Sequence, residues 1–247
     1  MSCAMRKQVL LVLMSLALSA HPSLSQEQIE PVYSIWDVQL GQSLSQARDS
    51  DVGEIACGTD GGPPGQELAS FNDYMTCAPE ASGLREVNFT YDDEQDYITL
   101  ALDVGYQFLK GGTSVYAQPV IVSLLVDEAG IVQGRRIATD DRTSDFDRRN
   151  AYTLIRNFKA RYGQWSLNCN DIPMKEGEQP VGNRFFHELC TGTSPDGLTR
   201  IAIEATYLRK KGQRAVSRET QEVNKGYFES QMRYEEVLAP YTPKAAP

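Results

Sequence analysis

Alternating apolar and polar residues predict two strands near the end of the chain. Residues 199–208 and residues 227–238 both alternate with a period of two, which is typical of strands with one buried face. The residues expected to face inward are Ile201, Ile203, Ala205 and Tyr207 in the first strand and Phe228, Met232, Tyr234 and Leu238 in the second. Residues 210–213 (KKGQ) open the loop between them.

A nearly continuous apolar run at residues 119–126 (PVIVSLLV) predicts a strand that is buried on both faces. Residues 127–130 (DEAG) have the composition of a turn, and residues 131–139 (IVQGRRIAT) are again typical of a strand. The pattern therefore predicts a hairpin.

Helical spacing occurs at residues 149–162, which place Ala151, Leu154, Ile155, Phe158 and Tyr162 on one face. Lys159 and Arg161 fall in the last turn of this predicted helix, where cations interact favourably with the helix dipole. A second helix is predicted to begin at Asp92, with Gln95 as its capping-box partner, and to end by Gly111.

The first 25 residues have the pattern of a secretory signal peptide. Arg6 and Lys7 precede twelve uncharged residues at 9–20, and the small residues Ala20 and Ser25 suit cleavage. Twelve residues are too few for a membrane span, which needs about 20. We therefore expect a soluble protein that is exported to the periplasm and does not span the membrane, with secretion from the cell as the alternative.

Net charge limits the choice of partners. The chain has 24 Lys+Arg and 33 Asp+Glu, a formal charge of −9, and without residues 1–25 the balance is 22 against 33, or about −11. This acidity argues against a nucleic-acid partner, which requires a basic surface. One basic stretch, Arg209, Lys210 and Lys211, is either a solvated loop or a contact for an acidic protein or an anionic envelope component.

Four cysteines follow the predicted signal peptide, and an even number in an exported protein indicates two disulfides. They are Cys57, Cys77, Cys169 and Cys190. Of the three possible pairings we favour the sequential one, Cys57–Cys77 and Cys169–Cys190, in which each bridge closes a loop worth about 3 kcal/mol. A zinc site is disfavoured because the chain has no C-x-x-C, and neither a metal nor a cofactor is expected.

The two cysteine pairs also suggest an internal repeat with an offset of about 112 residues. A Gly-Leu and a strand-like run follow each pair, at residues 83–91 and 197–207. We therefore predict an α+β fold of two related units, residues 26–142 and 143–238. Each unit would have antiparallel strands packed by one or two helices and one disulfide. The proline- and alanine-rich tail, residues 239–247, is predicted to be disordered.

The loop at residues 57–65 (CGTDGGPPG) is the most unusual segment. It is not a phosphate-binding loop, because Pro63 and Pro64 stand where such a loop needs backbone N–H donors. We interpret it as an extended turn held by a disulfide, with Asp60, Pro63 and Pro64 available to a partner.

Candidate catalytic residues are few. His187 is the one histidine after the signal peptide, and its position in a strand-like segment favours a satisfied, partly buried side chain. The acidic groups at residues 92–96 (DDEQD) lie at the start of one predicted helix and those at residues 140–147 (DDRTSDFD) precede the other, where acids complement the dipole. A hydrolase that uses carboxylates or His187 in a cleft between the units stays open as an alternative.

The segment at residues 56–65, together with residues 77–87 (CAPEASGLREV), resembles exported proteins of Gram-negative bacteria that share a C-G-x-D-G-G-P-P-G loop. The resemblance covers most of the chain after the signal peptide, implies a periplasmic location and transfers no activity. Our leading hypothesis is a non-catalytic binding or assembly module of the cell envelope. An inhibitor of a secreted enzyme is a third possibility, with Tyr74 and Tyr116 as aromatic anchors.

Overall fold

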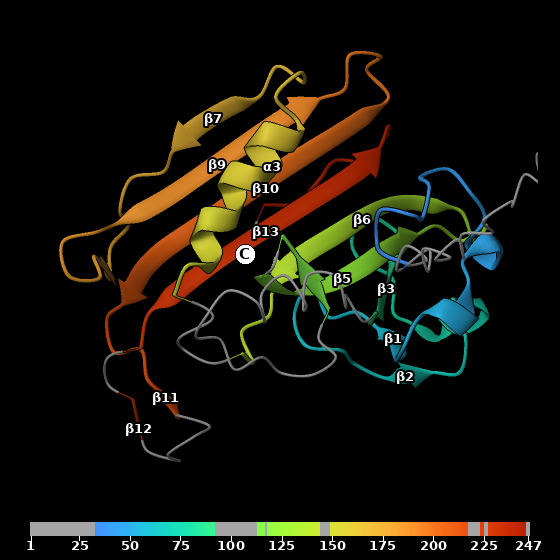
Figure 1. Cartoon of the computed structure of the whole chain (residues 1–247), viewed down its shortest axis with the longest axis horizontal. Coiled ribbons are helices and arrows are strands. Elements are labelled where there is room, and N and C mark those ends of the chain that lie inside the picture. The colour runs from blue at the N-terminus through green and yellow to red at the C-terminus, as the bar shows by residue number, and fades with distance from the viewer. Residues whose placement is uncertain are drawn as a thin grey trace, which may run out of the picture. The chain divides into compact units, whose positions relative to one another are not determined.

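The computed structural model describes residues 33–91, 113–116, 118–143, 149–216, 223–224 and 227–245. Most of the strands in these residues belong to one antiparallel sheet (Figure 1). Its strands, in spatial order, are β2 (Glu67–Leu68), β1 (Ile55–Cys57), β3 (Arg85–Phe89), β5 (Gln118–Val126), β6 (Val132–Thr139), β13 (Glu229–Leu238), β10 (Thr199–Lys210), β9 (Phe186–Thr193) and β7 (Asn168–Asp171).

Four short strands lie beside this path. They are β4 (Ser114–Val115), which pairs with β5, β8 (Glu178–Gln179), which pairs with β10, and a separate pair, β11 (Ala215–Val216) and β12 (Val223–Asn224). The predicted signal peptide and the helix predicted from Asp92 to Gly111 lie outside the described residues.

The prediction of an α+β fold is wrong, because the structure is nearly all-β. Among the described residues one α-helix occurs, α3 (Ile155–Arg161), and the other helical segments are 3-10 turns. These turns are Leu44–Gln46, Asp49–Asp51, Phe71–Thr76 and Ala151–Leu154. The turns before Cys57 stay short because residues 48–51 have no apolar stripe to pack against the sheet. Strands β6 and β13 pair across the boundary predicted between residues 142 and 143.

The strands predicted from hydrophobic patterning are confirmed. The apolar run became β5, which forms the predicted hairpin with β6, and the two alternating stretches became β10 and β13. The helix predicted at residues 149–162 is shorter, because its first turn is the 3-10 segment Ala151–Leu154.

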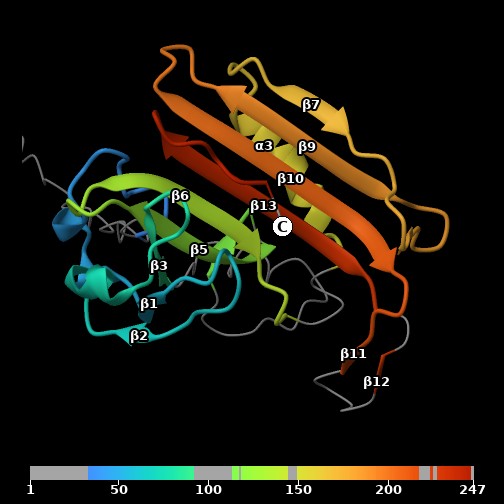
Figure 2. The same ribbon diagram turned by 180° about the vertical axis from the view of Figure 1, so that it is seen from behind.

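Helix α3 covers one face of the sheet over β9, β10 and β13 (Figure 1), and we call this side the front face. Its centre is Phe158, which is fully buried against Trp36 and Tyr234. The segment that contains Ile35, Val38 and Leu44 adds to the same core. Figure 2 shows the opposite side, the back face, which the helix does not cover.

Both disulfides form in the predicted sequential pairing. Cys57–Cys77 joins the end of β1 to the end of a 3-10 turn, whereas Cys169 and Cys190 lie directly opposite each other on β7 and β9. None of the helices in the described part of the chain has the length and apolar character to cross a bilayer.

Candidate functional site

The loop at residues 57–65 lies against the back face of the sheet. Its backbone N–H groups at Asp60 and Gly61 donate to the two oxygens of the Glu86 carboxylate at 2.6 and 3.0 Å. The approach requires glycine at position 58, where a Cβ would lie 2.1 Å from Cγ of Glu86. Gly61 has φ +79° and leaves room for Arg233. The loop is therefore both bridged by a disulfide and anchored to β3.

Arg136 of β6 is fully buried beneath this loop and contacts four carboxylates. Its Nη1 lies 2.8 Å from both Glu80 and Glu86 and 3.2 Å from Asp60, and its Nε donates to Glu235 at 2.8 Å. Burial alone would lower the pKa of Arg136, but the hydrogen bond to Glu80 and the charges of Glu86 and Glu235 raise it. The guanidinium therefore stays charged, and its surroundings compensate the cost of burial.

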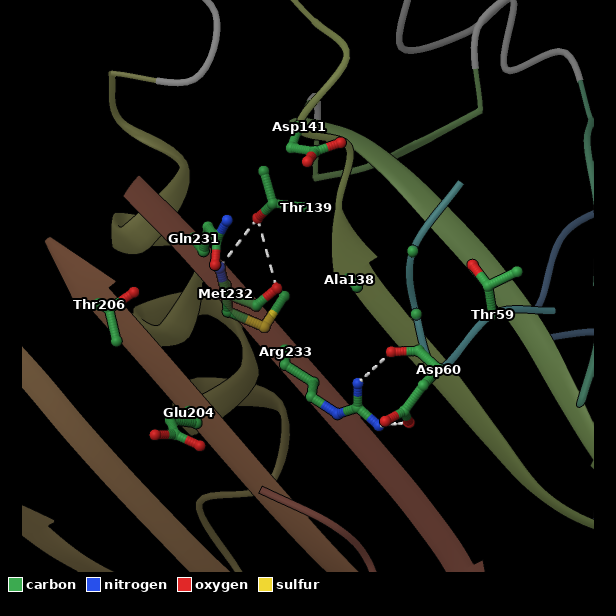
Figure 3. A pocket seen from close by; sticks show the side chains of 12 residues that line it. Thr59, Asp60, Ala138, Thr139, Asp141, Glu204, Thr206, Gln231, Met232 and Arg233 are labelled. Atoms are coloured by element: carbon green, nitrogen blue, oxygen red, sulfur yellow. Dashed lines mark hydrogen bonds and ion pairs between the residues drawn. The ribbon is translucent and has the colours of Figure 1, made fainter. Parts of the chain in front are cut away.

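A second guanidinium extends the cluster toward the surface. Arg233 donates from Nη1 to the carbonyl of Asp60 at 2.6 Å and from Nη2 to its carboxylate at 2.8 Å (Figure 3). Burial favours a raised pKa for Asp60, but Arg233, Arg136 and Lys244 outweigh it and lower this pKa. We call Asp60, Glu80, Glu86, Glu235, Arg136, Arg233 and Lys244 the charged cluster.

A groove of about 300 Å³ opens beside the charged cluster. The loop residues 59–62 form one side, and Glu204 and Thr206 of β10 line it together with Asp141, which follows β6 (Figure 3). The lining combines apolar surface, to which Ala138 and Met232 contribute, with hydroxyls, an amide and carboxylates, and Arg233 supplies one cation. Such a surface suits a polar or positively charged ligand.

The groove begins where β6 and β13 stop pairing. Their ladder runs from Gly134–Val237 to Ala138–Arg233. At the next position the hydroxyl of Thr139 accepts the N–H of Met232 at 2.9 Å and donates to its carbonyl at 3.3 Å (Figure 3). A side chain thus replaces the main chain of β6 and satisfies the backbone of β13 at the edge of the groove.

His187 is buried, and its Nε2 lies 2.6 Å from a carboxylate oxygen of Glu204. Its Nδ1 is also buried and has no hydrogen-bond partner among the residues described. His187 is not among the residues that line the groove, and its contact with Glu204 holds that carboxylate in place. The carboxylates of Asp141 and Glu204 do line the groove, one from each predicted unit.

The residues predicted to bind a partner do not form one surface. Asp60 lines the groove, and Pro63 and Pro64 continue its loop with Pro63 exposed. The hydroxyl of Tyr74 donates to the carbonyl of Glu128, and Tyr116, 39% exposed, packs on Phe158 of the front face.

The basic stretch lies elsewhere, at the end of β10. Arg209 is partly buried, Lys210 and Lys211 are exposed, and the Lys210 ammonium lies 3.1 Å from Glu229. These residues therefore lie at the exposed end of β10 and do not line the groove.

Sequence reasoning missed Glu86, Arg136, Glu204 and Arg233. The sequence did contain an indication of these residues, because each is a charged residue inside a predicted strand. A buried strand accepts such a residue only with a partner of opposite charge on a neighbouring strand. The partners could not be identified because the order of the strands, which places Arg136 opposite Glu235, was not predictable from the sequence.

A metal site is not formed by the cluster of Cys169, Glu188 and Cys190, although their ligand atoms lie within 4.8 Å of one another. Both sulfurs belong to one disulfide and supply no thiolate. Glu188 instead binds the ammonium of Lys159 at 2.7 Å.

Comparison of the chain with protein-family models, curated proteins and solved structures finds no match. The resemblance to exported Gram-negative proteins stays a prediction.

Proposed function

We propose that the chain is an exported, non-catalytic binding or assembly module of the cell envelope, and that it holds its partner in the groove beside the charged cluster. Two disulfides suit an oxidising compartment such as the periplasm. The signal peptide expected at residues 1–25 would deliver the chain there.

The observation that carries the proposal is how the charged groups beside the groove are held. Arg233 is bound by Asp60 and Glu235, and Glu204 lies against His187. The pKa of Asp60 is lowered, which is the wrong direction for a general acid. The Asp60–Arg233 pair is therefore better suited to position a ligand than to donate a proton.

A variant that fills the groove tests the proposal. Tryptophan in Thr206→Trp would occupy the groove, whereas Thr193→Trp places the same residue at an exposed position of the neighbouring strand β9. Exported protein would be immobilised and exposed to envelope extract, and captured proteins would be quantified by mass spectrometry. We expect the wild type and Thr193→Trp to recover the same partner, and Thr206→Trp to recover at least about tenfold less. Equal recovery by both variants would refute the role of the groove.

A carboxylate hydrolase is the second candidate, because Asp141 and Glu204 line the same groove. It predicts that the wild type releases sugars from envelope polysaccharide and that Asp141→Asn and Glu204→Gln each abolish the release. Our proposal predicts no release by any of the three proteins.

A further inference from the structure

The C-terminal tail crosses the back face and reaches the charged cluster at Lys244. Tyr241 packs on the small apolar cluster of Leu84, Leu125 and Val237. Three residues later, the backbone N–H of Lys244 donates to Glu235 at 3.0 Å. The residues predicted as a disordered tail thus make specific contacts as far as Lys244.

The Lys244 side chain occupies an acidic cradle, which we define as Asp60, Glu80 and Glu235. Its ammonium lies 2.5 Å from Glu80 and 3.5 Å from Asp60. Burial alone would raise the pKa of Glu80, but Arg136 and Lys244 lower it, so this carboxylate is ionised.

The charge balance of the cluster favours a cation in the cradle. Without Lys244 the cluster has four carboxylates, Asp60, Glu80, Glu86 and Glu235, against the guanidiniums of Arg136 and Arg233, a formal charge of −2. Lys244 reduces this to −1. An ammonium at this position is therefore favoured, whichever chain supplies it.

The contacts that hold the tail can be replaced by those of another segment. The Lys244 side chain is 36% exposed, and the neighbouring Thr242 and Ala245 are exposed. Partly exposed ion pairs are weak, so this segment opens more readily than the sheet beneath it. A tethered segment competes with free ligands only at an effective concentration in the millimolar range.

We propose that the acidic cradle is a recognition site for a lysine of an extended partner segment that carries an aromatic residue three positions earlier. The C-terminal tail occupies the cradle as an intramolecular competitor, which the partner displaces. The inference rests on the proposed function and names the chemistry of the partner: an extended, basic peptide segment of an envelope protein. The cradle shares Asp60 with the groove, so a bound segment extends toward the groove lining (Figure 3).

A labelled peptide with the sequence of residues 239–247 is the probe, and its binding to the full exported chain is measured by fluorescence anisotropy. Lys244→Ala weakens the competitor and leaves the cradle intact. We expect this variant to bind the peptide about tenfold more tightly than the wild type, because more of the cradle is free. Lys210→Ala removes an equally charged, exposed lysine that pairs with Glu229, and should bind as the wild type does.

The peptide with alanine in place of its lysine should not bind, and Glu80→Gln in the Lys244→Ala background should lose the gain. Equal binding of both peptides, or no gain in Lys244→Ala, would overturn the proposal. If the wild type forms a dimer that the peptide dissociates, the occupant is the tail of a second copy and the separate partner is refuted. Capture that depends on Thr206 without any peptide binding would reject this inference and leave the proposed function standing.

Discussion

The front and back faces of the sheet are both buried, but by different chemistry. On the front face, Phe158 and Tyr234 pack in a mainly apolar core and neither is exposed to solvent, although the Arg135–Glu236 pair lies beside the Tyr234 hydroxyl. On the back face, Arg136 is equally inaccessible and Glu86 and Glu235 are at most 3% exposed. Apolar burial is favourable in proportion to the buried area, so each apolar residue of the front face contributes to the free energy of unfolding largely independently of the others. A buried charge is tolerated only while all its partners are present. Substitution of one residue should therefore lower the free energy of unfolding by a small amount on the front face and by a large amount on the back face.

The largest effect is expected from Arg136→Met, which keeps much of the side-chain volume and removes the charge. The buried carboxylates of Glu86 and Glu235 would lose their partner, and we expect the free energy of unfolding to fall by about 3–5 kcal/mol in urea titrations. Arg200→Met is the control, because Arg200 is only half-buried and donates to the carbonyl of Tyr241. A loss below about 1 kcal/mol at Arg136 would contradict the comparison.

Removal of the Cys57–Cys77 bridge tests whether the back face depends on its loop. The double variant Cys57→Ala and Cys77→Ala should lose about 3 kcal/mol, the entropy of a loop that spans 20 positions. The matched variant without Cys169–Cys190, which spans 21 positions, should lose a similar amount in unfolding free energy. Only the first should also weaken the contacts of Asp60 with Arg233, visible as faster hydrogen exchange at residues 58–62.

Intermediate effects are expected from pH, which should act on the two faces at opposite ends of the scale. On the back face, the folded-state pKa of Glu80 is lowered from its ordinary 4.5. The stability that this carboxylate contributes is present above pH 4.5 and is lost as the pH falls through its folded-state pKa. On the front face, burial and the charge of Glu236 raise the pKa of Tyr234 above its ordinary 10.0. That contribution is present below pH 10.0 and is lost as the pH rises.

Urea midpoints measured from acid to alkali distinguish these contributions. Glu80→Gln should flatten the loss of stability in acid and leave the alkaline loss unchanged, and Tyr234→Phe should do the reverse. If Glu80→Gln changed both limbs equally, the faces would not titrate independently.

The smallest change is expected from Ile203→Val, which removes one methylene from the front-face core. Ile203 is fully buried, and the expected loss in unfolding free energy is about 1 kcal/mol. A loss as large as that of Arg136→Met would show that the front face is no more tolerant than the back.

The same contrast explains what the sequence could predict. The hairpin of β5 and β6 and the strands β10 and β13 were predictable because each depends on a local pattern of apolar residues. The disulfides were predictable because both close short loops. The α+β class was wrong because it required one or two helices in each unit and rested on a repeat, whereas the described residues contain one short α-helix, α3.

The charged cluster was not predictable, since its contacts join distant segments. Asp60 binds Arg233 over a separation of 173 residues, and Arg136 binds Glu235 over 99. The glycines of the loop indicated a tight turn but not the surface against which it packs. Strand order supplies that information, and alternation within a single strand does not.

The loop packs against β3 only because the residue at position 58 is glycine, which has no side chain to clash with Glu86. Any larger residue would collide with the aliphatic part of Glu86, which the loop itself and Arg136 hold in place. The loop can therefore pack against Glu86 only with glycine at this position. Gly58→Ala would act as a wedge, lifting the segment from β3 and leaving every ionisable group of the protein chemically unchanged.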